Sequence, residues 1–168
     1  MSEQLQEVLK KQKEQLNSSL LDKDKKEEEI VQLVGFMVGR EEYAVPILSI
    51  QEIIKPIDYT RVPQTPPYVL GVFNLRGNVL PLVDLRIKFN APNTEQSEDM
   101  RYIVIKDKEN VAGFVIDQIT EAIRLNEKRI ENPPETLKNS NSAISGIGKR
   151  ENSIITILKV DELLKRDF

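Results

Sequence analysis

The chain has 168 residues, of which 39% are hydrophobic and 30% are charged, and its formal net charge is −3. This size is enough for one domain or two small packed lobes. The mild acidity argues against nucleic acid as a partner, because nucleic-acid binding needs a dense basic face. The sequence contains no cysteine and no histidine. That composition excludes disulfides, thiolate metal sites and the usual general base near neutral pH, so we expect no enzyme, no metal site and no cofactor.

Residues 1–29 form a highly charged segment. Pairs such as Leu5/Leu9 and Leu16/Leu20 lie four residues apart and would form a thin apolar stripe on a helix. Two interpretations stay open: a frayed or disordered extension, and a helical arm that docks on a partner. No apolar run in the chain is long enough to span a bilayer, and this segment lacks the apolar core of a signal peptide. The sequence therefore predicts a cytoplasmic protein without direct membrane insertion.

The composition changes at Ile30, where β-branched and aromatic residues become frequent. The stretch "IVQLVGFMVGREEYAV" predicts a hairpin that turns at residues 39–42. "ILSIQEII" predicts a short helical turn that leads into a strand. The proline-rich residues 55–71 indicate a rigid extended connection rather than a helix. A second hairpin follows, and Asp84 is placed to cap a short helical turn after it.

The second half continues the pattern of short strands. "MRYIVIKDKENVAGFVIDQITEAIRL", residues 100–125, predicts a strand, a tight polar turn and two further strands. Residues 126–143 indicate a loop, residues 144–160 a last hairpin, and the following residues a short helix capped by Asp161. Many short strands separated by turn signals favour an all-β barrel or sandwich.

The two halves resemble each other weakly. "EYAVPILSIQEI" aligns with "NVAGFVIDQITEA" once one residue is inserted, which places Ala44 on Ala112 and Glu52 on Glu121. This match fits two related small barrels, each of which would close its sheet and remove exposed edges.

The hairpin "GVFNLRGNVLPLVD", residues 71–84, is among the most apolar stretches of the chain. We expect Gly77-Asn78 to be its two-residue loop in a type II′ turn. Because side chains alternate along a strand, one face is then a core face. The other face is rich in valine but includes Asn74 and Arg76.

Arg76 is the cation in this apolar hairpin. Arginine suits an interface because its planar fork makes several directed hydrogen bonds. A charge inside an apolar segment needs a partner. Two interpretations stay open: Arg76 contacts another protein, or it pairs internally with a carboxylate such as Glu52 or Asp84.

Several blocks resemble the bacterial CheW family of chemotaxis coupling proteins, over about residues 31–164. They are "YAVPILSIQEIIKPIDYTRVPQTPPYVL", "GVFNLRGNVLPLVDLR", "VAGFVIDQITEAIRL" and "ISGIGKRENSIITILKVDELL". The resemblance implies an all-β fold of two packed SH3-like five-stranded β-barrels with short helices and a C-terminal helix. It implies a CheW-like domain over residues 30–168, with two intertwined β-barrel subdomains at about 40–92 and about 100–160 between which the first strand is expected to be shared. Residues 1–29 are not part of the pattern.

The same resemblance implies a non-enzymatic adaptor. Such a scaffold couples the cytoplasmic tip of methyl-accepting chemoreceptors to the regulatory domain of the histidine kinase CheA, in signalling arrays beneath the inner membrane. Other CheW-like domains are further expected partners, in rings. The alternative is the CheW-like domain of a CheV-type adaptor, or the regulatory domain of CheA itself. The chain ends after a short helix with no receiver-type pattern, which favours a stand-alone protein.

The resemblance also implies site residues. The expected receptor-binding positions are Ile50, Glu52, Tyr102, Gly113 and Ile119. The expected kinase or array interface consists of Gly71, Asn74 and Arg76. Each has a plain alternative, since the apolar residues also suit a core and the glycines also suit a constrained backbone.

Overall fold

The computed structural model describes residues 6–11, 29–92, 97–140 and 142–165. The strands are β1 (Ile30–Val38), β2 (Glu41–Pro46), β3 (Ile50–Ile54), β4 (Val69–Leu75), β5 (Asn78–Asp84), β6 (Arg101–Asp107), β7 (Asn110–Ile116), β8 (Gln118–Asn126), β9 (Ile130–Glu131), β10 (Ile144–Lys149) and β11 (Ile154–Leu158). The short helices are η1 (Ile47–Ser49), α2 (Leu85–Lys88), η2 (Glu127–Arg129), α3 (Glu135–Ser140) and α4 (Val160–Leu163). Residues 6–11 are also helical, with Val8 and Leu9 half exposed. The rest of the predicted extension, except its last residue, lies outside the described residues.

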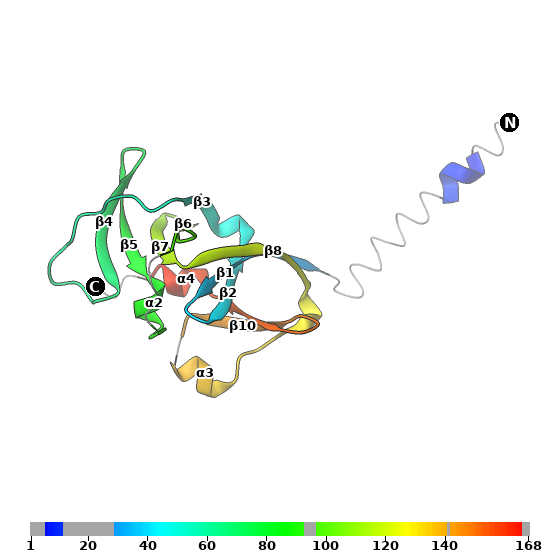
Figure 1. The fold of residues 1–168 in the computed structure, drawn as a ribbon. Coiled ribbons are helices and arrows are strands. Elements are labelled where there is room, and N and C mark those ends of the chain that lie inside the picture. The colour runs from blue at the N-terminus through cyan, green and yellow to red at the C-terminus, as the bar shows by residue number, and fades with distance from the viewer. Residues whose placement is uncertain (1–5, 12–28, 93–96, 141, 166–168) are drawn as a thin grey trace.

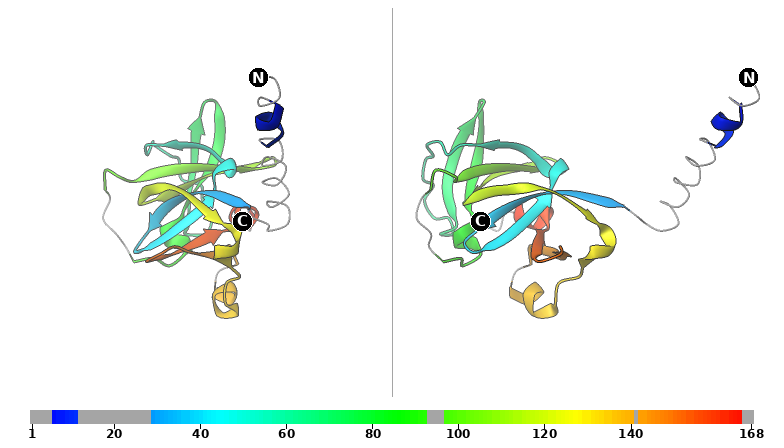
Figure 2. Two further views of the ribbon diagram at one scale, coloured as in Figure 1. Left: turned by 90° about the vertical axis from the view of Figure 1, so that its right-hand side faces the viewer. Right: turned by 45° about the vertical axis from the view of Figure 1, so that its right-hand side comes forward.

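The strands form two curved sheets that lie side by side (Figures 1 and 2). One has six strands in the order β8-β1-β2-β11-β10-β9, and the other has five in the order β3-β6-β7-β5-β4. The prediction of an all-β protein with two packed sheets is confirmed. The strand count differs from five and five because β9 pairs two residues with β10 and adds a sixth strand.

Three apolar clusters make up the core. One contains Phe73 and Leu82 and belongs to the five-stranded sheet, and one contains Leu33 and Ile155 and belongs to the six-stranded sheet. The third draws on both sheets and includes the fully buried Phe114. Each sheet therefore buries its own interior, and a shared cluster joins the two.

The chain crosses between the sheets twice. It leaves the six-stranded sheet after β2, passes through η1 and enters the five-stranded sheet at β3. It returns at Asp117, between β7 and β8. The five-stranded sheet thus uses strands within residues 50–116, and the six-stranded sheet takes strands from before and after them. These stretches differ from the predicted subdomain ranges of 40–92 and 100–160.

The two halves of the chain follow the same topology. Each strand of the first half has a counterpart in the second: β1 corresponds to β6, β2 to β7, β3 to β8, β4 to β10 and β5 to β11. When every strand is exchanged for its counterpart, the strand order of one sheet becomes that of the other, with β9 as the exception. The one parallel pair in each sheet is also equivalent, with β11 beside β2 and β5 beside β7. The molecule therefore has an internal pseudo-two-fold relation.

The strand registers correct the predicted internal alignment. Ala44 lies opposite Ile157 in the parallel pair of one sheet, and Gly113 lies opposite Leu82 in that of the other. Ala44 is therefore equivalent to Gly113 and not to Ala112, and the two stretches align without an insertion. The predicted match of Glu52 with Glu121 is retained. Matching residue identities misplaced the alanines, because strand pairing and not side-chain identity sets the register.

The proline-rich connection is extended, as predicted, and it covers an edge of the five-stranded sheet. Thr60 forms an isolated bridge with Val72 of β4, in which each amide donates to the other carbonyl at 2.7 and 2.8 Å. This pairing occupies backbone groups on β4 that would otherwise be exposed.

The β4–β5 turn differs from the prediction. Leu75 pairs with Asn78, so the two loop residues are Arg76 and Gly77, with φ values of 53° and 87°. Positive φ at both central residues defines a type I′ turn, which matches the twist of the flanking strands. The faces of the strands are unchanged, but Arg76 moves from a strand face into the turn.

Two smaller expectations were also wrong. The stretch predicted as a loop, residues 126–143, contains η2, β9 and α3. The C-terminal helix begins at Val160 after Lys159, without a side-chain cap, so Asp161 lies in its first turn instead of capping it. The prediction that Asp84 caps α2 is confirmed, since its carboxylate accepts a hydrogen bond from the Arg86 amide.

Candidate functional site

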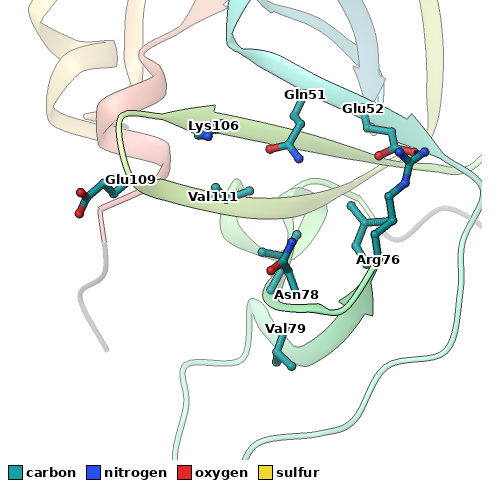
Figure 3. Close-up of a pocket in the computed structure, with 10 residues that line it drawn as sticks. Gln51, Glu52, Arg76, Asn78, Val79, Lys106, Glu109 and Val111 are labelled. Atoms are coloured by element: carbon teal, nitrogen blue, oxygen red, sulfur yellow. Dashed lines mark hydrogen bonds and ion pairs between the residues drawn. The ribbon is translucent and has the colours of Figure 1, made fainter.

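A groove of about 520 Å³ opens at one end of the five-stranded sheet. The β4–β5 turn forms one wall, β3 forms a second and the β6–β7 hairpin forms a third (Figure 3). Its lining residues are Gln51, Glu52, Leu75, Arg76, Asn78, Val79, Leu80, Lys106, Glu109 and Val111. The lining mixes both signs of charge with aliphatic surface.

Arg76 spans this groove. Its Nη2 lies 2.8 Å from Oε1 of Glu52 on β3. Since β3 and β4 are the two edges of this sheet, the ion pair joins strands that are farthest apart in the sheet order. The side chain of Arg76 remains 78% exposed, whereas that of Glu52 is 23% exposed. The structure thus selects Glu52, and not Asp84, as the internal carboxylate, and it leaves most of the guanidinium open to solvent.

The turn that carries Arg76 is fixed by a side chain. The Gly77 amide donates to Oδ1 of Asn74 at 2.9 Å. The adjacent Val79 is 66% exposed and lies on the same strand face as Asn74. The predicted interface residues Asn74 and Arg76 are therefore brought together at one exposed hairpin tip.

A second arginine occupies the tip of the equivalent hairpin. Arg150, between β10 and β11, pairs with Glu42 on β2 and Glu121 on β8. Its side chain is only 20% exposed, and that of Glu42 is 17% exposed. Sequence analysis missed the contacts of Arg150 across its sheet, because its partners are distant in the chain.

Ile50 and Ile119 occupy equivalent positions near the starts of β3 and β8. Ile50 pairs with Ile105, and Ile119 pairs with Phe36. Both are partly buried and pack against the core cluster that the two sheets share. Close by in the chain, Leu48 of η1 is 97% exposed. The junction of the sheets therefore presents apolar side chains at its surface, and sequence reasoning missed Leu48 because it lies inside an apolar run.

Three other predicted site residues are buried. Tyr102 is 4% exposed and donates its hydroxyl to the Ile57 carbonyl at 3.0 Å. Burial is the largest cause of the raised pKa of Tyr102. A Cβ at Gly113 would lie 2.6 Å from the Phe73 ring, and one at Gly71 would lie 2.0 Å from the Thr60 carbonyl oxygen. These residues shape the five-stranded sheet from inside.

Two negative findings apply to the described part of the chain. No three histidine, cysteine, aspartate or glutamate side chains gather there in a way that would hold a metal ion. No helix there has the length and apolarity needed to cross a membrane.

The fold and the candidate site define a two-sheet β module, with apolar side chains exposed at the junction of its sheets and a charged groove at the tip of one hairpin. The CheW-like domain family matches residues 32–168. The chain belongs to the family of CheW-like domains.

Individual relatives agree with this assignment. The chemotaxis protein CheW of Helicobacter pylori is 52% identical over 168 residues, which is all of both chains. That of Bacillus subtilis is 35% identical over 136 residues, which is 80% of this chain and 87% of the relative. The crystal structure of the scaffolding protein TtCheW from Thermoanaerobacter tengcongensis has a TM-score of 0.77 at 29% identity, and covers 83% of this chain and 95% of that chain. The expected family and fold are confirmed.

Proposed function

We propose that this protein is a non-enzymatic chemotaxis scaffold that couples chemoreceptors to the histidine kinase CheA. The observation that carries the proposal is the 52% identity with a chemotaxis protein CheW over the whole of both chains. The similarity in fold to a crystallised scaffolding protein supports the same function. This protein works in the cytoplasm, at receptor arrays beneath the inner membrane.

The receptor tip docks at the junction of the two sheets. Ile50 and Ile119 supply apolar surface from both sides of the junction, and the exposed Leu48 extends it. A receptor tip is helical, and a helix laid into a groove is recognised through apolar anchors of this kind. Glu52 follows Ile50 by two residues on β3 and offers a carboxylate at the edge of the sheet. The buried Tyr102 and Gly113 act by holding the sheet in shape.

The regulatory domain of CheA, or another CheW-like domain in a ring, docks at the β4–β5 hairpin. Arg76 offers an exposed guanidinium that Glu52 holds in place, and Asn74 fixes the turn. Directed hydrogen bonds from a positioned arginine suit the centre of an interface. Gly71 supports this surface indirectly, because only a residue without a Cβ fits beside Thr60.

Two alternatives share this fold but assign the domain to a different protein. The domain could be the CheW-like part of a CheV-type adaptor or the regulatory domain of CheA. The stand-alone adaptor is favoured because the matched Helicobacter pylori protein is a CheW that this chain covers completely.

Reconstitution tests the function. Receptor fragments, CheA and this protein are combined, and kinase activity is measured with and without the protein. We expect receptor-dependent control of the kinase only when the protein is present. Equal kinase activity in both mixtures would contradict the proposal.

A further inference from the structure

The two crossovers between the sheets are equivalent in position but opposite in chemistry. Leu48 lies as far beyond Ala44 as Asp117 lies beyond Gly113, so the two residues occupy equivalent places. Leu48 is 97% exposed, whereas the side chain of Asp117 is 16% exposed. The crossover at Leu48 exposes an apolar side chain to solvent, whereas the crossover at Asp117 is held by hydrogen bonds and an ion pair.

Those charged groups form what we term the inter-sheet ion cluster: Asp84, Arg86, Asp117 and the amide of Gly39. Arg86 donates to both carboxylate oxygens of Asp84, from Nε at 3.1 Å and from Nη2 at 3.0 Å. Its Nη1 donates to Oδ1 of Asp117 at 3.4 Å. Oδ2 of Asp117 accepts from the Gly39 amide at 2.6 Å.

The cluster is held tightly. Asp84 is the one buried charged residue of the described chain, at 4% exposure, and the side chain of Arg86 is 14% exposed. Bidentate pairing of a guanidinium with a carboxylate fixes the relative orientation of both groups as well as their distance. The hydrogen bond with Asp84 raises the pKa of Arg86, so the guanidinium keeps its charge.

The members of the cluster come from both sheets. Asp84 ends β5 and Arg86 lies in α2, beside the five-stranded sheet, while Gly39 lies in the β1–β2 turn of the six-stranded sheet. Asp117 is the crossover itself. At the other crossover the equivalents of Asp84 and Asp117 are Lys159 and Leu48, which cannot form this arrangement.

We propose that Arg86 is a positioning residue that fixes the relative orientation of the two sheets. Ile119 follows Asp117 by two residues. Fixing Asp117 therefore fixes the side of the receptor site that Ile119 provides. The effect on receptor binding rests on the proposed function, whereas the effect on sheet orientation does not.

Distances between spin labels test the orientation directly. The chain has no cysteine, so introduced cysteines are the sole labelling sites. One label pair, Glu109→Cys with Glu151→Cys, spans the two sheets at exposed hairpin turns. A second pair, Glu109→Cys with Asn78→Cys, lies within the five-stranded sheet.

The variants are Arg86→Lys and the milder Asp117→Asn, and both are compared with Lys149→Ala. Lys149 forms an exposed ion pair with Glu131 inside the six-stranded sheet and serves as the matched control. We expect either cluster variant to broaden the distribution of distances between the sheets, while distances within the sheet and the control stay unchanged. Two unchanged distributions in folded Arg86→Lys and Asp117→Asn proteins would overturn the proposal, even if their melting temperatures fall. Should Arg86→Lys fail to fold, the Asp117→Asn distribution decides alone.

Binding provides the second readout. We expect Arg86→Lys and Asp117→Asn to weaken binding of a receptor-tip helical fragment by about tenfold or more, while binding of the CheA regulatory domain changes little. Equal losses for both partners would contradict selective positioning of the receptor site. If the unaltered protein binds no receptor fragment, the proposed function fails, and the spin-label result still decides whether Arg86 orients the sheets.

Discussion

Two hairpins at equivalent places in the two sheets each carry an arginine at the tip, and the two arginines lie in opposite environments. Arg150 pairs with two carboxylates, and its side chain is 20% exposed. Arg76 pairs with one carboxylate, Glu52, and its side chain is 78% exposed. Each arginine reaches from its hairpin to another strand of its own sheet.

The difference shows how a duplicated architecture divides its tasks. A guanidinium that two carboxylates surround has little capacity left for a partner, and its removal leaves poorly solvated charges behind. An exposed guanidinium held by one carboxylate contributes little to stability but keeps most of its donors available. We therefore propose that Arg150 serves the fold and that Arg76 serves an interface.

Of the substitutions compared between the two halves, those at two equivalent glycines are expected to differ most in their effect on the free energy of unfolding. Gly71 and Gly146 each follow a register shift in equivalent hairpins. A Cβ at Gly71 would meet the Thr60 carbonyl oxygen at 2.0 Å, and its φ is 155°, whereas at Gly146 the nearest atom is a side-chain methyl of Ile130 at 2.9 Å. Gly71→Ala should lower the free energy of unfolding by about 3 kcal/mol or prevent folding, and Gly146→Ala by about 1 kcal/mol. Urea unfolding measures both, and equal losses would refute the distinction.

Removing the buried arginine should have the next largest effect. Arg150→Ala leaves Glu42 poorly solvated and without its cation, so we expect a loss of about 2 to 3 kcal/mol in the free energy of unfolding. The control is Lys149→Ala, which removes an exposed ion pair on the neighbouring residue and should cost under about 0.5 kcal/mol. A loss for Arg150→Ala no larger than the control would show that the surrounding carboxylates are adequately hydrated.

Alkaline pH should destabilise both sheets through one tyrosine in each. Burial is the largest cause of the raised pKa of Tyr43, with a hydrogen bond to Glu41 next, and burial also raises the pKa of Tyr102. In the unfolded chain both ionise near pH 10, whereas in the folded state the raised pKa keeps each tyrosine neutral to a higher pH. Their contribution is complete below pH 10 and is lost above it, at up to about 1.4 kcal/mol per tyrosine per pH unit. Tyr43→Phe and Tyr102→Phe should flatten this decline in denaturation curves between pH 9 and 11.

The smallest stability effect is expected at the exposed arginine. Arg76→Ala should change the free energy of unfolding by under about 0.5 kcal/mol, because its ion pair is largely solvated. A loss as large as that for Arg150→Ala would contradict the claim that the two arginines differ in their contribution to stability. Urea unfolding under the same conditions makes the two values comparable.

Local patterns predicted most of the fold. The hairpins, the short turn into β3 and the cap at Asp84 follow from alternation, glycine and proline placement and capping chemistry, all of which act over a few residues. The type of the β4–β5 turn was wrong because Arg76 adopts a positive φ that is unusual outside glycine. The hydrogen bond from Gly77 to Asn74 compensates for it, and no short pattern announces that bond.

The site was less predictable, because its contacts join distant parts of the chain. The pairing of Arg76 with Glu52 was one of two internal options, and only the curvature of the sheet decides between them. Arg86 follows Asp84 by two residues in the sequence, but its contact with Asp117 depends on how the two sheets pack together. Exposure of Leu48 likewise depends on the path of the crossover, not on its apolar neighbours.

The central claim is that Arg76 acts on a partner and not only on Glu52. A charge swap tests it: Arg76→Glu, Glu52→Arg and the double variant are compared for unfolding free energy and for affinity to the CheA regulatory domain. We predict that the double variant recovers the stability of the unaltered protein, because the ion pair is rebuilt in reverse, while its affinity stays at least about tenfold weaker. Recovery of both stability and affinity in the double variant would contradict the claim and assign Arg76 a purely internal role.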